Sequence, residues 1–196
     1  MARRADHTAQ ELKSLAIGKG LEIIDKQGMS GLTARGLAQA IGYTPGTLYH
    51  FFGSLDGYLL VLSAHILDLW HQELTAKIKA SRRPAIHTLA AAYIDFALAR
   101  KNRWELAFAR NYPPDLPLPD DYVSNMARLL MLIDQSLTKH EPQADKRHRL
   151  AKTLWASMHG ICSLAHTQRL SYSAGDTPEA LAKVLLELLE QKKAVS

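Results

Sequence analysis

Cysteine is almost absent from this 196-residue sequence, which contains Cys162 and no other. A single cysteine excludes an internal disulfide and any zinc site built from several cysteines, and it suits a reducing compartment. Continuous apolar runs near ~18 residues are also missing, and the first residues lack the apolar core of a signal peptide. We therefore expect a cytoplasmic protein without a membrane partner.

Strand patterns and internal repeats are lacking too, so the chain is expected to be all-α with about nine helices. Apolar residues make up 47% of the sequence and charged residues 22%, which is typical of a globular protein. Gly28, the break at 81–84 and the proline-rich loop 111–121 separate the helical patterns. The expected helices cover about 12–27, 33–41, 45–52, 54–80, 85–101, 103–110, 122–140, 145–171 and 178–193.

Acidic charge does not dominate: the formal net charge is +5 and the isoelectric point is near 9.3. Such a balance is compatible with nucleic-acid binding. However, residues 1–60 carry six Lys and Arg against five Asp and Glu, so most of the excess lies further along the chain. Arg3 and Arg4 fall in residues 1–6, which we expect to be a flexible arm. Any case for DNA binding must therefore rest on a motif.

That motif lies in residues 32–56, which predict two short helices around a tight turn. Thr33 is a good N-cap for the first helix, and Gly42 suits the left-handed conformation that ends it. Thr44 can cap the second helix, whose first position is Pro45. The faces expected to pack together are formed by Leu37, Ala38, Ile41, Leu48, Phe51 and Phe52. A glycine turn between two crossing helices is typical of a helix-turn-helix.

The same stretch resembles the DNA-binding domain of the tetracycline-repressor (TetR) family of bacterial transcriptional regulators. The family pattern runs from Leu32-Thr33 through Ala38 and Gly42 to the block Gly-Thr-Leu-Tyr-His-Phe-Phe at 46–52. One departure is visible, because Leu55 stands where the family usually has a lysine. The phosphate contact made by that lysine is therefore not expected here.

The resemblance, over roughly residues 8–65, implies a helix-turn-helix domain at 1–53 and a helical ligand-binding and dimerisation domain at 54–196, linked by the helix 54–80. A recognition helix enters the major groove with its N-terminal end toward the bases. The residues expected to contact DNA are Thr33, Arg35, Thr44, Pro45, Gly46, Thr47, Tyr49 and His50. Arg35 is alternatively a solvated surface residue.

Trp155, His159 and Gly160 match the Trp-x-x-x-His-Gly signature of one C-terminal domain type within this family. The resemblance implies that this domain binds a small inducer, which is unidentified. The expected lining is mostly apolar with a few polar anchors: Tyr93, Phe96, Trp104, Phe108, Tyr112, Met126, Leu130, Trp155 and His159. Each of these residues is alternatively plain core.

Dimerisation has support from the residues themselves, since the last two helices carry wide apolar faces. The expected interface comprises Leu154, Ile161, Ala165, Leu181, Leu185 and Leu188. Two helices from each subunit would form a four-helix bundle with two-fold symmetry. Intrachain packing against residues 122–140 is the alternative.

No cofactor, metal or catalytic site is expected. Gly18-Lys19-Gly20 lies inside a helix with no preceding strand, and is therefore no phosphate-binding loop. His159 and His166 lack a neighbouring carboxylate or cysteine that would complete a metal site. The resemblance implies a homodimeric regulator, a repressor in most of this family, released from its operator by a small apolar molecule. The alternatives are a regulator without a ligand, or a helical small-molecule-binding protein.

Overall fold

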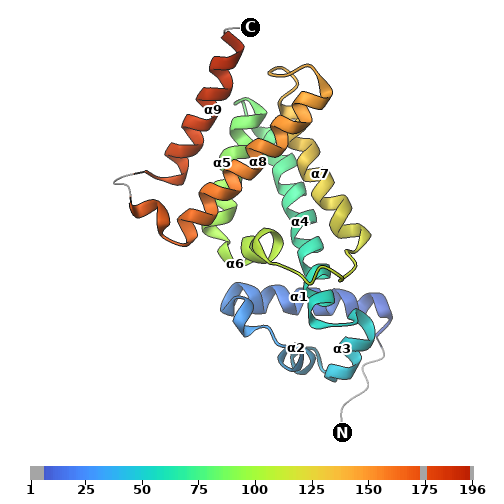
Figure 1. Ribbon diagram of the computed structural model, residues 1–196. Helices are drawn as coiled ribbons and strands as arrows, with labels where there is room; N and C mark the ends of the chain where they lie inside the picture. The colour runs from blue at the N-terminus through green and yellow to red at the C-terminus, as the bar shows by residue number, and fades with distance from the viewer. Residues whose placement is uncertain (1–6, 173–175, 195–196) are drawn as a thin grey trace. The chain divides into compact units, whose positions relative to one another are not determined.

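A computed structural model describes residues 7–172 and 176–194, and in this part of the chain it contains nine α-helices and no strand (Figure 1). The all-α expectation is therefore confirmed. The arm at residues 1–6 lies outside the described residues. The helices are α1 (Ala9–Gln27), α2 (Ala34–Ile41), α3 (Pro45–Phe52), α4 (Leu55–Ala80), α5 (Ala85–Ala99), α6 (Lys101–Trp104), α7 (Asp120–Ser136), α8 (Ala144–His166) and α9 (Pro178–Ala194).

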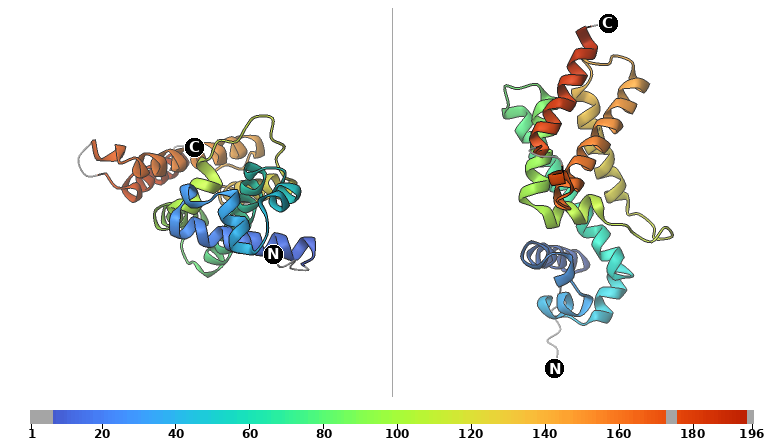
Figure 2. Two further views of the ribbon diagram at one scale, coloured as in Figure 1. Left: turned by 90° about the horizontal axis from the view of Figure 1, so that it is seen from below. Right: turned by 60° about the vertical axis from the view of Figure 1, so that its left-hand side comes forward.

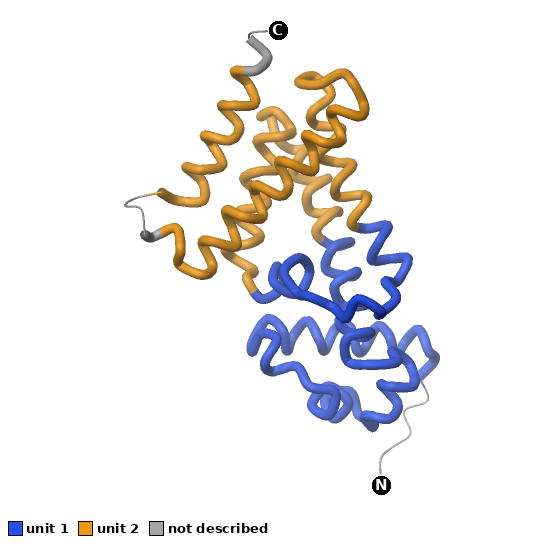
Figure 3. Tube along the Cα trace, in the orientation of Figure 1, with its two compact units in different colours: residues 1–69, 102–125 blue, residues 70–101, 126–196 orange. Residues whose placement is uncertain are grey.

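The chain divides into two compact units, coloured separately in Figure 3. Unit 1 comprises residues 1–69 and 102–125, and unit 2 comprises residues 70–101 and 126–196. This is a division by packing. A functional boundary after residue 53 stays a prediction.

In unit 1, α1 packs against α2, which in turn packs against α3, and the three helices lie together in Figure 2. Its start is capped twice, because the Thr8 side chain accepts from the Glu11 backbone N–H while the Glu11 carboxylate accepts from the Thr8 N–H at 2.7 Å. Leu12, Ala16 and Ile24 are buried along one face. The Tyr58 hydroxyl of α4 donates to the Ala16 carbonyl at 2.8 Å, which joins α4 to α1.

A π-helical turn at Glu105–Ala109 follows α6 in unit 1. Residues 103–110 were expected to be helical, and they are helical as far as Ala109, with the wider π-helical hydrogen-bonding pattern from Glu105 onward. Ser63, fully buried on α4, donates to the Leu106 carbonyl at 3.1 Å and lies 2.9 Å from the Tyr112 hydroxyl. The Leu106 carbonyl, inside the π-helical turn, therefore accepts a hydrogen bond from the Ser63 side chain.

In unit 2, α5, α8 and α9 pack against one another. The α5 helix is buried on most sides; its buried residues are Ile86, Leu89, Ala90, Ala92, Tyr93, Ile94, Phe96 and Ala97. Arg147 of α8 donates to Asp134 of α7 at 2.8 Å, which joins the helices flanking the 137–143 turn. Cys162 is fully buried on α8, and burial raises the pKa of its thiol to about 12.

No single helix among the described residues is long and apolar enough to cross a membrane. The α3 and α4 helices meet the length and composition requirement only when joined, and the chain bends sharply between them.

Candidate nucleic-acid interface

The α2–α3 turn forms as the residue types predict. Gly42 adopts a left-handed conformation with φ 79°, and its N–H bonds back to the last turn of α2. Pro45 occupies the first turn of α3, after the N-cap Thr44. Both helices are only eight residues long, or about two turns each.

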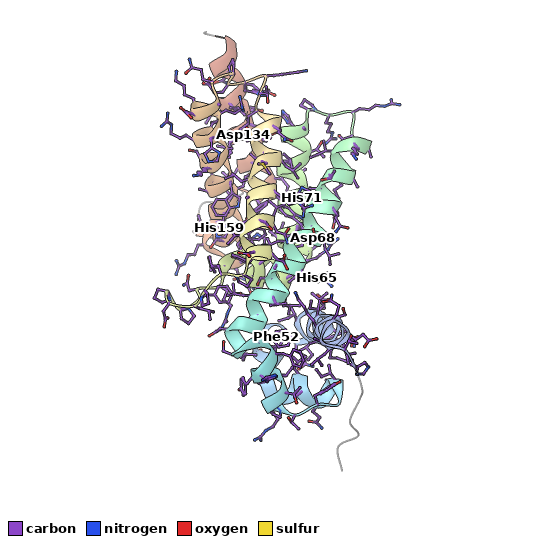
Figure 4. All side chains as sticks on the ribbon, turned by 90° about the vertical axis from the view of Figure 1, so that its right-hand side faces the viewer. Phe52, His65, Asp68, His71, Asp134 and His159 are labelled. Carbon is purple, nitrogen blue, oxygen red and sulfur yellow. The ribbon has the colours of Figure 1, made fainter. Side chains whose placement is uncertain are left out.

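The outer side of α3 is formed by Tyr49 and His50, which are exposed, while Leu48 on the opposite side is buried. Phe51 was expected in the core and is instead 43% exposed. Phe52 takes the inward position and makes an edge contact with the Tyr58 ring at 5.1 Å between centroids (Figure 4 labels Phe52). An eight-residue helix has one inward face, which Leu48 and Phe52, four residues apart, occupy together.

Thr33 and Thr44 begin the two helices in the same way. The Gly36 N–H donates to the Thr33 hydroxyl oxygen at 3.0 Å, and the Thr47 N–H donates to that of Thr44 at 3.3 Å. The hydroxyls of Thr44 and Thr47 lie 3.1 Å apart. The remaining N–H groups of a helix start carry partial positive charge and bind anions such as phosphate.

Acidic side chains are absent from residues 26–55, which span both helices. The same stretch contains two cations, Lys26 and the exposed Arg35. Unit 1 as a whole is not basic, with eight Lys and Arg against ten Asp and Glu. The α2 and α3 helices and the turn between them therefore carry no carboxylate that would repel a phosphate.

Residues after α5 contact α1 directly, which the sequence did not indicate. Arg103 makes two hydrogen bonds to the Asp25 carboxylate, at 2.7 and 2.6 Å. The Asn102 amide donates to the Ile24 carbonyl at 3.0 Å, and its oxygen lies 3.2 Å from the place a Cβ would take on Gly28. The start of α6 is thereby fastened to the end of α1.

The residues expected to line a ligand site fall into two groups. In unit 2, Tyr93 and Phe96 of α5 lie against Trp70, with ring centroids 5.5 and 5.1 Å away, and the Tyr93 hydroxyl lies 3.2 Å from His159 Nδ1. The Trp155 ring is tilted against the His159 ring, with centroids 5.8 Å apart. Trp70 was missed, because on the apolar helix α4 nothing in the sequence distinguishes it from other core residues. We call these five residues the aromatic cluster.

The other expected lining residues lie elsewhere. Trp104, Phe108 and Tyr112 belong to unit 1, where Trp104 is buried and the Arg110 guanidinium lies 5.5 Å from the Tyr112 ring centroid. Met126 and Leu130 are half-buried on α7 in unit 2. Their role in binding a ligand stays a prediction.

Burial lowers the pKa of His159 below its usual value of 6.5. A neutral imidazole has one nitrogen that accepts a hydrogen bond, so Nδ1 can accept from the Tyr93 hydroxyl. His159, labelled in Figure 4, is therefore a neutral polar group among aromatic rings.

The residues expected at a dimer interface differ in exposure. Leu188 is 59% exposed, while Ile161, Ala165, Leu181 and Leu185 are half-buried and Leu154 is buried within the chain itself. Val184, on the same expected apolar face, is 51% exposed and lies one turn before Leu188 on α9. An apolar face on α9 is thus left at the surface of the single chain.

Two stretches of the chain match models of known protein families. Residues 17–58 match the model of bacterial regulatory proteins of the tetR family, and residues 86–189 match the model described as tetracyclin repressor-like, C-terminal domain. The HTH-type transcriptional regulator BetI of Paraburkholderia phytofirmans is 30% identical over 147 residues, covering 72% of this chain and 74% of that protein. The BetI protein of Paraburkholderia phymatum is 37% identical over 75 residues, and there the match spans 37% of this chain and 38% of its own length.

Two solved structures share the fold. FadR of Bacillus subtilis, in complex with stearoyl-CoA, has a TM-score of 0.60 at 16% identity and covers 90% of this chain and 96% of its own. FadR of Thermus thermophilus, in complex with lauroyl-CoA, has a TM-score of 0.63 at 17% identity, covering 92% and 94%. The family model over residues 86–189 spans more than half of the sequence, and the one over 17–58 coincides with the helix-turn-helix. The chain therefore belongs to the TetR family of bacterial transcriptional regulators, which act by binding DNA and not as enzymes.

Proposed function

We propose that this protein is a dimeric repressor that binds a palindromic operator and leaves it when a small apolar ligand binds unit 2. The observation that carries the DNA part is the α2–α3 pair. Its two capped helix starts, its exposed Tyr49 and His50, and the absence of acidic residues from 26 to 55 together suit a duplex.

The expected base contacts come from the start and outer side of α3: Thr44, Pro45, Gly46, Thr47, Tyr49 and His50. Thr33 and the backbone N–H groups of both helix starts are assigned to phosphates. Arg35, exposed in the first turn of α2, is assigned to a phosphate or a base edge. A good base contact contributes about 1–3 kcal/mol of discrimination.

Operator selection from a random duplex library, followed by footprinting, tests this assignment. We expect an inverted repeat with half-sites about one helical turn apart, or a multiple of it. Tyr49→Ala should then weaken operator binding by about 1–3 kcal/mol without changing the melting temperature, because its side chain is exposed. Phe51→Ala is the matched control, since Phe51 is similarly exposed on α3 and has no assigned contact. Selection without enrichment of any sequence would refute the proposed function.

The ligand part rests on the aromatic cluster, in which a neutral His159 and the Tyr93 hydroxyl offer polar anchors among rings. Unit 2 carries sixteen Lys and Arg against nine Asp and Glu, which favours an apolar ligand that also carries an anionic group. The ligands of the two FadR structures make fatty-acyl-CoA thioesters the first class to test.

Thermal unfolding with acyl-CoAs of graded chain length, and with CoA alone, measures this directly. A ligand that binds the folded state raises the melting temperature by mass action, and the same compound should release operator DNA. Trp155→Ala should abolish both responses while leaving operator binding largely intact. If no acyl-CoA shifts the melting temperature, this ligand class is wrong. A regulator without a ligand then becomes the better description if a wider apolar screen also fails.

A further inference from the structure

We propose that unit 2 binds a second DNA duplex, one without the operator, through a basic surface formed by the α4–α5 and α7–α8 turns. This contact goes beyond the proposed operator contact, because neither turn belongs to the α2–α3 pair. Six exposed cations carry it, and we call them the basic end of unit 2: Lys79, Arg82, Arg83, Lys139, Lys146 and Arg149.

The two turns lie at the same end of unit 2. The Arg128 guanidinium of α7 donates to His71 Nδ1 of α4 at 3.0 Å, so these two helices lie side by side. In Figure 1 and in the right-hand view of Figure 2, both helices finish at the same end of the unit, where α5 and α8 begin. The cations of the two turns are therefore available to one and the same partner.

The charge of these turns is concentrated and unpaired. Residues 77–83 and 139–152 together contain nine Lys and Arg against two Asp and Glu. Arg147, beside the basic end on α8, pairs with Asp134 at 2.8 Å, whereas the six cations of the basic end form no ion pair with any described residue. In the described part of unit 1, by contrast, four of the six Lys and Arg pair with carboxylates. A polyanion would therefore meet more unpaired cations at the basic end than on unit 1.

The apolar residues of this surface favour a nucleic acid over a lipid or a protein. No large apolar side chain is exposed in the described residues 77–84 and 137–152, where Leu137 is buried and Ile78 and Leu150 are half-buried. Helices that bind a membrane surface insert apolar side chains beside their cations, and protein interfaces have an apolar or aromatic centre. Binding to the DNA backbone needs neither, because it depends on cations that release counterions from phosphates.

Fluorescence anisotropy tests the proposal with the full-length protein already saturated by stoichiometric, unlabelled operator. A labelled duplex that lacks the operator should still bind, with a dissociation constant of about 10⁻⁴–10⁻⁶ M at physiological salt. Arg82→Gln/Arg83→Gln and Lys146→Gln/Arg149→Gln should each make the slope of log K against log salt about 1.8 less steep, which corresponds to two lost phosphate contacts. The affinity for the operator should stay the same in both variants.

Arg169→Gln/Lys183→Gln is the charge-matched control, because it removes two exposed cations of unit 2 that lie outside the basic end. The control should bind the second duplex with the wild-type slope, and an equal change in slope would show that net charge alone attracts DNA and would overturn the inference.

Two further results would overturn it and leave the proposed function standing. One is a wild-type protein that binds no second duplex. The other is tighter binding to phosphatidylserine vesicles or to polyglutamate than to the duplex, which would assign the basic end to a membrane or to an acidic protein. Failure to select any operator would instead overturn the proposed function, and the same variants titrated with the labelled duplex alone would still test the basic end.

Discussion

Gly18 and Gly20 lie two residues apart on α1 and have opposite surroundings. A Cβ on Gly20 would overlap the Tyr58 hydroxyl, which is buried and bonded to Ala16, whereas a Cβ on Gly18 would meet nothing within 4 Å. We expect Gly20→Ala to lower the free energy of unfolding by about 1–3 kcal/mol through overpacking. Gly18→Ala should raise it by about 0.5–1 kcal/mol, because alanine is the better helix former.

Urea unfolding of both variants measures these two changes in the free energy of unfolding, which should have opposite signs. Adding Tyr58→Phe to Gly20→Ala removes the hydroxyl that the new methyl meets, so the double variant should lose less than the sum of the two single changes. Strict additivity would mean that Gly20 and Tyr58 do not meet as the structure has them.

A second prediction at the residue scale concerns how the stability of the folded protein depends on pH. Burial lowers the pKa of His159 in the folded protein below 6.5, so the folded state binds fewer protons than the unfolded state. This contribution to stability is complete above pH 6.5 and is lost progressively as the pH falls below it. His159→Gln should flatten the pH dependence of the urea midpoint below pH 6.5. Identical profiles for wild type and His159→Gln would contradict the assigned burial.

Among the elements, the π-helical turn Glu105–Ala109 depends on one side chain. Ser63→Ala removes the hydroxyl that donates to the Leu106 carbonyl and meets the Tyr112 hydroxyl, in a site with no exposed surface. Leaving such groups unsatisfied costs about 1–3 kcal/mol, measured as loss of unfolding free energy. Tyr112→Phe, at a half-buried position, should cost less, and the double variant should be non-additive because both changes act on one network. Additive losses would show that the two hydroxyls act independently.

The same turn shows why sequence prediction succeeded for some elements and failed for others. The ends of α2 and α3 were predictable because Thr33, Gly42, Thr44 and Pro45 act locally, through caps and backbone conformation. Nothing local distinguishes an i→i+5 turn from an α-helix, since its register depends on Ser63, more than forty residues away. Long-range contacts of this kind are absent from any short pattern.

The candidate sites show the same difference between features set by neighbouring residues and features set by long-range contacts. The helix-turn-helix could be predicted from the sequence because helix caps and a glycine turn, which depend only on neighbouring residues, define both of its helices. Sequence patterns could not predict that Arg103 pairs with Asp25 or that Trp70 belongs to the aromatic cluster. Each of these contacts depends on which distant segments of the chain meet. Phe51 was misplaced because periodicity alone cannot choose between two adjacent phenylalanines in so short a helix.

At the level of the whole molecule, dimerisation through α9 gives a further prediction. Leu188→Glu places a carboxylate on the exposed apolar face that it shares with Val184, where burial in a dimer would leave the charge unpaired at a cost of several kcal/mol. We expect a folded monomer in analytical ultracentrifugation and loss of tight operator binding. Met131→Glu is the matched control, since Met131 is 52% exposed on α7. A Leu188→Glu protein that sediments as a dimer would place the interface elsewhere.

The buried thiol of Cys162 makes this protein well suited to spectroscopic labelling. With its side chain fully buried and its pKa raised to about 12, almost no thiolate forms near neutral pH, and the thiolate is the species that reacts with maleimides and methanethiosulfonates. A cysteine introduced at an exposed position of α3 would therefore be the principal site of modification in the native chain. Spin labels placed there would report the separation of the two α3 helices in the proposed dimer in solution, with and without a candidate ligand, on an otherwise unaltered protein.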